Sequence, residues 1–162
     1  MIELLTANTP NGQKISIMLE EIGLEYKVTK ININKDDQFN PEFRKISPFS
    51  KIPVIKDGET SVFESGAILI YLGEKSEKFY DKSERLSINQ WLMGQMAYVG
   101  PMLGQHHQFH HYNSGKSKFG EERYFKIAKR IYEDLDERLA QSKYLAGENY
   151  TIADIATFPW IA

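Results

Sequence analysis

Short apolar runs alternate with helical patterns in the first half of the chain. Apolar residues from Ile15 to Ile22 recur at the spacing of one helix face, and Gly23 is a typical helix stop. A second apolar helix is predicted at Ala67–Leu72. The predicted strands are Ile2–Thr6, Tyr26–Ile33, Ile52–Lys56 and Thr60–Phe63, and the last two are joined by a hairpin turn at Asp57–Gly58. This order predicts a mixed sheet with helices on its faces, an α/β domain that we assign to residues 1–75.

The second half shows only helical patterns after a polar segment at residues 74–83. Gly100–Pro101 predicts a kink in the first of these helices, because proline lacks an N–H and clashes with the preceding turn. Apolar positions from Tyr124 to Leu139 predict an amphipathic helix, and Thr151–Asp154 matches a capping box before an apolar helix. The residues that share a face of the kinked helix are Leu92, Met96, Val99 and Leu103. We therefore expect an all-α domain over residues 84–162.

Composition and charge argue against several classes of function. Leu, Ile, Val and Phe supply 42 of the 162 residues, which is enough for a packed core. The 20 basic and 22 acidic residues are spread over both halves, which argues against a nucleic-acid partner. The longest apolar run, Ala67–Leu72, is too short to span a membrane, and Met1–Thr6 reads as a strand and not as a signal peptide. With no cysteine, the chain has no disulfide, thiolate metal site or cysteine nucleophile, and it fits a reducing, cytoplasmic compartment.

The turn Thr9–Gly12 is the first candidate for chemistry. Thr9 is a typical helix cap and Pro10 a typical first helical residue, so the turn presents a hydroxyl, the Asn11 amide and backbone N–H groups at a helix N-terminus. Such a terminus suits an anion. If the anion is a thiolate, a ligand must supply it, and lowering a thiol pKa from about 8.5 to about 6.5 requires about 2.7 kcal/mol. One or two charge-assisted hydrogen bonds could supply that. Judged in isolation, a simple helix cap is the favoured explanation of these residues.

Two further segments could hold a ligand. A cis bond before Pro53 would turn the Ile52 backbone outward to pair with an extended peptide, whereas a trans proline in an edge strand is the more common arrangement. Ser65 precedes an apolar helix, so its hydroxyl and N–H could hold a carboxylate while Glu64 meets an amine. A plain helix cap is again the simpler explanation of this segment.

All four histidines lie at His106, His107, His110 and His111, which form two i, i+4 pairs. This spacing could place two metal ligands on one helix face. No acidic residue lies between Arg85 and Glu121, and no cysteine can provide a third ligand, so a structural or site-lining cluster is favoured over a metal site. Residues 86–115 carry no Asp, Glu, Lys or Arg, which fits either a core helix or one buried between domains or subunits.

Taken in order, these motifs resemble the glutathione transferase superfamily, with its thioredoxin-like N-terminal domain and helical C-terminal domain. The motifs that carry the resemblance are Thr9–Gly12, Ser47–Pro53, Phe63–Ile68 and Thr151–Asp154. More narrowly, the Thr-Pro-Asn-Gly turn, Gly100–Gln105 and the adjoining histidines resemble the nu class. That class includes glutathione-dependent disulfide-bond reductases and is related to the fungal nitrogen-regulator prion protein.

The resemblance implies glutathione, reduced or oxidised, as the ligand, and no metal. Thr9 and Asn11 would face its sulfur, replacing the Tyr, Ser or Cys of other classes. Ile52, ahead of a cis Pro53, would pair with the cysteinyl backbone. Because the chain has no cysteine, ligands would bring all the sulfur for thiol–disulfide exchange.

The remaining ligand contacts follow from the same resemblance. Glu64 and Ser65 would hold the γ-glutamyl end, and Gln38 and Lys51 would add further contacts. Arg123 matches a position that reaches glutathione from the neighbouring subunit of a homodimer.

The resemblance implies reduction of small disulfides with glutathione, with weak peroxide reduction as a further activity. Conjugation of glutathione to an electrophile is one alternative, and a non-catalytic glutathione-binding regulatory module is another. Members of the family continue for several helices beyond the Thr151–Asp154 motif, so the helical domain is expected to be short at its C-terminal end and incomplete.

Overall fold

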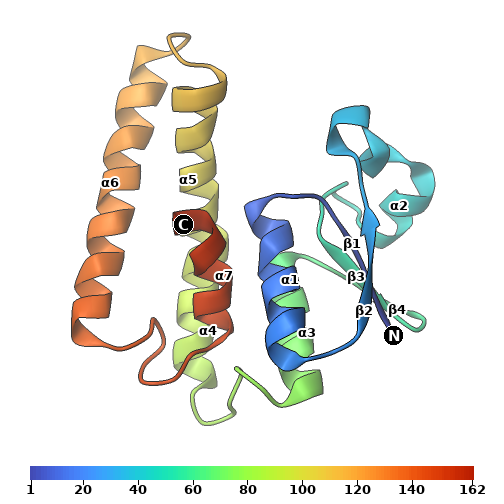
Figure 1. Ribbon diagram of the computed structural model, residues 1–162. Coiled ribbons are helices and arrows are strands. Elements are labelled where there is room, and N and C mark those ends of the chain that lie inside the picture. The colour runs from blue at the N-terminus through green and yellow to red at the C-terminus, as the bar shows by residue number, and fades with distance from the viewer. The chain divides into compact units, whose positions relative to one another are not determined.

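The computed structural model describes residues 1–162, which divide into two compact units, Met1–Asp81 and Lys82–Ala162 (Figure 1). The first unit is a four-stranded sheet with helices on both faces, and the second is entirely helical. This is the predicted class of fold, a thioredoxin-like α/β unit followed by an all-α unit. None of the helices combines the length and apolar character that crossing a membrane requires.

The sheet of the first unit has the strand order β2-β1-β3-β4. The central strand β1 (Ile2–Thr6) runs parallel to β2 (Tyr26–Lys30) and antiparallel to β3 (Val54–Asp57), and β3 pairs in turn with antiparallel β4 (Thr60–Phe63). Two of the strands therefore come from a parallel crossover and two from a hairpin, which produces the mixed sheet that the sequence predicts.

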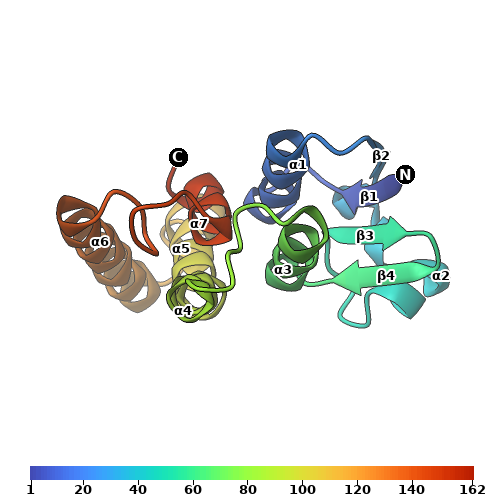
Figure 2. The same cartoon turned by 90° about the horizontal axis from the view of Figure 1, so that it is seen from below.

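Helices cover the two faces of this sheet differently. Helices α1 (Pro10–Ile22) and α3 (Ser65–Ser76) pack together on one face, and the short α2 (Pro41–Ile46) lies on the other (Figure 2). Neighbouring strand residues face opposite sides, so the pair Leu5 and Val54 faces α2 and packs with Phe43. The alternate pair, Leu4 and Ile55, is fully buried and faces the α1–α3 layer.

Several predicted boundaries in the first unit are wrong by a few residues. Strand β2 ends at Lys30, because the Asn32 side chain caps a 3-10 turn at Ile33–Lys35. Asp57 pairs with Thr60, so the hairpin turn consists of residues 58–59 and not of residues 57–58. Helix α3 extends to Ser76 and takes in part of the segment that was predicted as a polar link.

One continuous helical segment begins the second unit. It consists of α4 (Arg85–Gly94), a π turn (Gln95–Val99), α5 (Gly100–His107) and a second π turn (Gln108–Tyr112). The Gly100 N–H bonds to the Gln95 carbonyl, so the wide turn comes directly before Pro101 at the place predicted to kink. The extra residue of the turn also brings Gln95 into the core, while Met96 and Val99 of the predicted apolar face are only half-buried.

Helix α6 (Lys118–Gln141) runs alongside α5 and is the amphipathic helix that the apolar spacing predicts (Figure 1). Its buried face forms a cluster with α5 and with the connection to the last helix. The cluster contains Leu103, Ala128, Ile131, Leu135 and Leu145. On the exposed face, Arg130 Nε lies 2.9 Å from Asp134 Oδ1, an i, i+4 ion pair.

The last helix, α7 (Ile152–Ile161), begins with the predicted capping box. Asp154 Oδ2 accepts hydrogen bonds from the Thr151 N–H at 2.9 Å and from Thr151 Oγ1 at 3.0 Å. Asp154 Oδ1 accepts a third bond, 2.8 Å long, from the Leu145 N–H. One carboxylate therefore fixes both the start of α7 and the segment that leads into it.

Replacing Asp154 with Ala should destabilise the protein by about 2–3 kcal/mol, since three hydrogen bonds to a charged acceptor are lost at a helix start. Thermal and denaturant unfolding would measure the change. Asp136→Ala, an exposed carboxylate on α6, is the matched control and should shift stability by less than about 0.5 kcal/mol. Equal effects of the two substitutions would contradict this account of the cap.

Candidate functional site

The connection from β1 to α1 forms the first part of the site. Thr9 has extended backbone angles, and its Oγ1 accepts a hydrogen bond from the Gly12 N–H at 3.2 Å. Pro10 is the first residue of α1, as predicted, and the side chains of Thr9 and Asn11 are both partly exposed. Because Thr9 Oγ1 is the acceptor in its capping bond, the hydroxyl hydrogen of Thr9 can still be donated to a ligand.

Gly12 allows this connection to pass close to the helix. A Cβ at this position would overlap the Ala7 carbonyl oxygen and Thr6 Oγ1. The backbone oxygen cannot move without shifting Thr9, because the Thr9 N–H bonds to the Ala7 carbonyl at 2.8 Å. The fourth residue of the Thr-Pro-Asn-Gly turn is thus required for its shape.

The Gly12→Ala variant should displace the turn, weaken binding at the α1 N-terminus and destabilise the protein by about 2 kcal/mol or more. Gly94→Ala is the matched control, because a Cβ on this helical glycine meets nothing within 4 Å. The control should be neutral or should stabilise by up to about 1 kcal/mol, as alanine favours a helix. Unfolding measurements on both variants test this, and equal stabilities would refute the close contact at Gly12.

The loop before β3 forms the second part of the site. The Ile52–Pro53 peptide bond is cis, as the family resemblance implied, and the backbone of Ile52 has no hydrogen-bond partner within the chain. Ser47 braces this loop, since its Oγ donates to the Lys51 carbonyl at 2.7 Å and accepts from the Lys51 N–H at 3.1 Å. The bracing role of Ser47 was not predicted, because a serine before a proline has many uses in loops.

The start of α3 forms the third part of the site. Glu64 precedes the helix with a positive φ of 70° and an exposed side chain, and Ser65 is buried as the first helical residue. Lys14 of α1 reaches this point, with its Nζ 3.4 Å from Ser65 Oγ. Burial lowers the pKa of Lys14 to about 7, while the negative charge of Glu64 opposes the shift.

The strand pairing brings the three parts together at one edge of the sheet. Leu5, near the end of β1, pairs with Val54 at the start of β3, and Val54 also pairs with Phe63 at the end of β4. The segments that follow β1, precede β3 and follow β4 are therefore neighbours. They carry the Thr9–Asn11 turn, the Ile52 backbone and the Glu64–Ser65 pair. Motifs as far apart in the sequence as Thr9 and Ser65 thus converge on one site.

The other candidate contacts are Gln38, Lys51 and Arg123, which lie on three different segments of the chain. Gln38 lies in a 3-10 turn, where its Nε2 donates to the Ile33 carbonyl at 3.5 Å and its Oε1 is buried without a partner. Lys51 is exposed beside Ile52. Arg123 is exposed on α6 of the second unit, where its guanidinium lies 6.0 Å from the centre of the Tyr124 ring.

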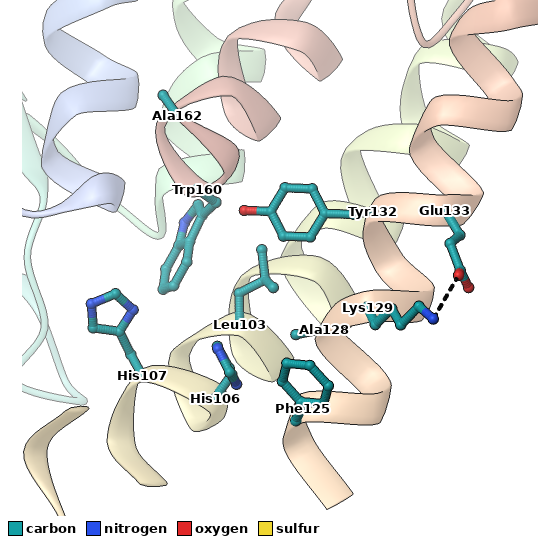
Figure 3. Close-up of a pocket in the computed structure, with 10 residues that line it drawn as sticks. All are labelled: Leu103, His106, His107, Phe125, Ala128, Lys129, Tyr132, Glu133, Trp160 and Ala162. Carbon is teal, nitrogen blue, oxygen red and sulfur yellow. Dashed lines mark ion pairs between the residues drawn. The ribbon is translucent and has the colours of Figure 1, made fainter. Parts of the chain in front are cut away.

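Two of the four histidines, His106 and His107, line a cavity of about 580 Å³ in the helical unit (Figure 3). The aromatic rings of Phe125, Tyr132 and Trp160 also border it. The centres of the His106 and His110 rings are 4.4 Å apart. Burial lowers the pKa of His106, and repulsion by His110 and His107 lowers it further. No three His, Asp or Glu side chains are arranged to hold a metal ion, so the metal-binding alternative lacks a ligand set.

Two family models cover most of the chain. The glutathione S-transferase N-terminal domain matches residues 2–74, and the glutathione S-transferase C-terminal domain matches residues 99–162. The chain therefore belongs to the glutathione S-transferase family.

Two relatives and one solved structure are similar to almost the whole chain. The disulfide-bond oxidoreductase YfcG of Escherichia coli strain K12 is 48% identical over 99% of this chain and 79% of that protein. The disulfide-bond oxidoreductase YghU of the same organism is 40% identical over 98% of this chain, which spans only 59% of the length of YghU. A crystal structure of a Pseudomonas putida glutathione transferase, with one glutathione disulfide bound per subunit, has a TM-score of 0.91 and 42% identity over 99% of this chain and 74% of that one.

Proposed function

We propose that this chain binds glutathione and uses it to reduce small disulfides. The observation that carries the proposal is the partly exposed Thr9–Asn11 turn at the N-terminus of α1, in a chain without cysteine. The names of YfcG and YghU, and the glutathione disulfide bound to the Pseudomonas putida transferase, support the same reaction and the same ligand. A bound glutathione thiolate is then the nucleophile.

The reaction is two successive thiol–disulfide exchanges. The thiolate of bound glutathione attacks one sulfur of the substrate disulfide, forms a mixed disulfide and releases the other sulfur as a thiolate that takes up a proton. The thiolate of a second glutathione attacks the glutathione sulfur of the mixed disulfide. Oxidised glutathione forms, and the remaining substrate thiol leaves with a proton. Both electrons come from the two glutathione molecules, so the protein needs no redox group of its own.

Thr9 and Asn11 act on the sulfur. The Thr9 hydroxyl hydrogen and the Asn11 side-chain amide can both be donated to a thiolate, and both residues stand where the helix dipole favours negative charge. Two such hydrogen bonds are enough to lower the thiol pKa by about two units, at about 1.5–3 kcal/mol each. This shift makes the thiolate the main form of the bound ligand near neutral pH.

The rest of the ligand lies along the same edge of the sheet. The unpaired Ile52 backbone bonds to the cysteinyl backbone of glutathione, as in the addition of a short strand. Glu64 binds the γ-glutamyl amine, and Ser65 binds the γ-glutamyl carboxylate at the start of α3. Gln38 and Lys51 make further contacts with the ligand.

The Asn11→Ala variant tests the reaction. We expect kcat/KM for reduction of 2-hydroxyethyl disulfide with glutathione to fall about 100-fold or more, as when one donor to a developing anion is removed. Asn8→Ala is the matched control, because Asn8 is exposed and its Oδ1 bonds only across the turn to Gln13 Nε2 at 3.1 Å. That variant should retain activity within about threefold.

Three results would contradict the proposal. Equal activity of the Asn11→Ala and Asn8→Ala variants would remove Asn11 from the reaction. Faster turnover with a chlorinated aromatic electrophile than with any disulfide would favour the conjugating transferase. Binding of glutathione without either reaction would favour the regulatory module.

The proposal also includes the oligomeric state of the protein and its location in the cell. The chain acts as a homodimer in the cytoplasm, and the exposed Arg123 guanidinium binds glutathione of the partner subunit. Sedimentation velocity should then show a dimer, and Arg123→Ala should weaken glutathione binding about tenfold without changing the stability of the subunit. A monomer at micromolar concentration, or unchanged binding in the Arg123→Ala variant, would contradict this arrangement.

A further inference from the structure

Lys14 is a buried amine that the proposed reaction does not use. Lys14 is only 1% exposed, because it lies on the face of α1 that packs against α3. From there Nζ reaches Ser65 Oγ, 3.4 Å away and 51 positions later in the chain. Burying a charged lysine is costly unless hydrogen bonds or an opposite charge compensate for its lost hydration.

The contact fixes the direction in which Ser65 can donate. In its charged form the Lys14 amine can only donate, so it occupies a lone pair of Ser65 Oγ and leaves the hydroxyl hydrogen to point elsewhere. Ser65 is the first residue of α3, where the helix N-terminus favours an anion. A positive charge behind the hydroxyl makes Ser65 a stronger donor to an anion in front of it.

Glu64, just before α3, is a charged group whose field reaches Lys14. Other charged groups on the neighbouring elements have partners of their own. Glu3 of the neighbouring strand β1 pairs with Lys27, and Lys75 of α3 pairs with Asp57. Glu20, at the far end of α1, accepts a hydrogen bond from Tyr26. Burial lowers the pKa of Lys14 and the charge of Glu64 raises it, so a second anion at the start of α3 would act in the same direction as Glu64.

We propose that Lys14 is a positioning residue for the ligand carboxylate. It aligns the Ser65 hydroxyl and supplies a positive charge behind it, and binding of a carboxylate at Ser65 draws a proton onto Lys14. This inference rests on the proposed function, because the carboxylate is that of the γ-glutamyl group of glutathione.

The sign of the pH dependence follows from the charge. The pKa of Lys14 is about 7 without ligand, and a carboxylate nearby raises it by favouring the charged amine. Affinity for the ligand is then highest below about pH 7 and falls as the pH rises from the free pKa to the bound pKa. Between those two values, binding takes up protons from solution.

Calorimetry with S-methylglutathione measures this uptake directly, because the methyl group removes the titrating thiol. Titrations at about pH 7.5 in buffers of different ionisation enthalpy should show uptake of about half a proton per site by the unmodified protein. Lys14→Met should abolish that part of the uptake and weaken binding about tenfold at about pH 6.5, but much less at about pH 8.5. Methionine is straight and apolar, so it fits a buried lysine site.

The control is Lys78→Met, since the Lys78 amine also bonds to α1, at the Ile22 carbonyl, 3.2 Å away at the opposite end of the helix. This variant should keep both affinity and proton uptake. In disulfide reduction, Lys14→Met should raise KM for glutathione about tenfold and leave kcat at saturating glutathione within about twofold.

The proposed function and the role of Lys14 would be overturned by different results. No binding of S-methylglutathione or glutathione by the unmodified protein would overturn both the proposed function and the role of Lys14. Binding without proton uptake by the unmodified protein would overturn the role of Lys14 alone. So would a Lys14→Met variant that is folded and binds with unchanged affinity and pH dependence.

Discussion

The close contact between α1 and the end of β1 is the constraint on which the rest of the site depends. Gly12 lets the Ala7 carbonyl and Thr6 Oγ1 approach the helix, and this approach sets Thr9 as the cap and Asn11 in the first turn. The same helix carries Lys14 one turn further, where it meets Ser65. A single small residue thus links the end of β1, the start of α1 and, through α1, the start of α3.

The sheet provides the second level of organisation. Its register brings the segments after β1, before β3 and after β4 to one edge, and each segment offers a different kind of group. The first offers side-chain donors, the second an unpaired backbone and the third a helix N-terminus with a buried amine behind it. A tripeptide with a thiol, two carboxylates and an amine matches this set. Since the chain contains no cysteine, such a ligand also explains how it could carry out sulfur chemistry.

Local patterns predicted most of the fold and the motifs of the site. Capping chemistry predicted the starts of α1 and α7, because those hydrogen bonds join residues two or three positions apart. The π turn at Gln95–Val99 could not be predicted, since it depends on how Pro101 and the core of the unit are accommodated together. The burial of Lys14 had one visible sign, a lysine on the apolar face of α1, but its partner Ser65 is distant in sequence.

The state of the bound sulfur tests the central claim most directly. A pH titration of glutathione bound to the protein, followed by the ultraviolet absorbance of the thiolate, gives the pKa of the ligand thiol. The account predicts a pKa near 6.5, about two units below the value of about 8.5 for a free cysteine thiol, and a return toward the free value in Asn11→Ala. A bound thiol that titrates at the free value would contradict it, because the α1 N-terminus would then not stabilise the thiolate.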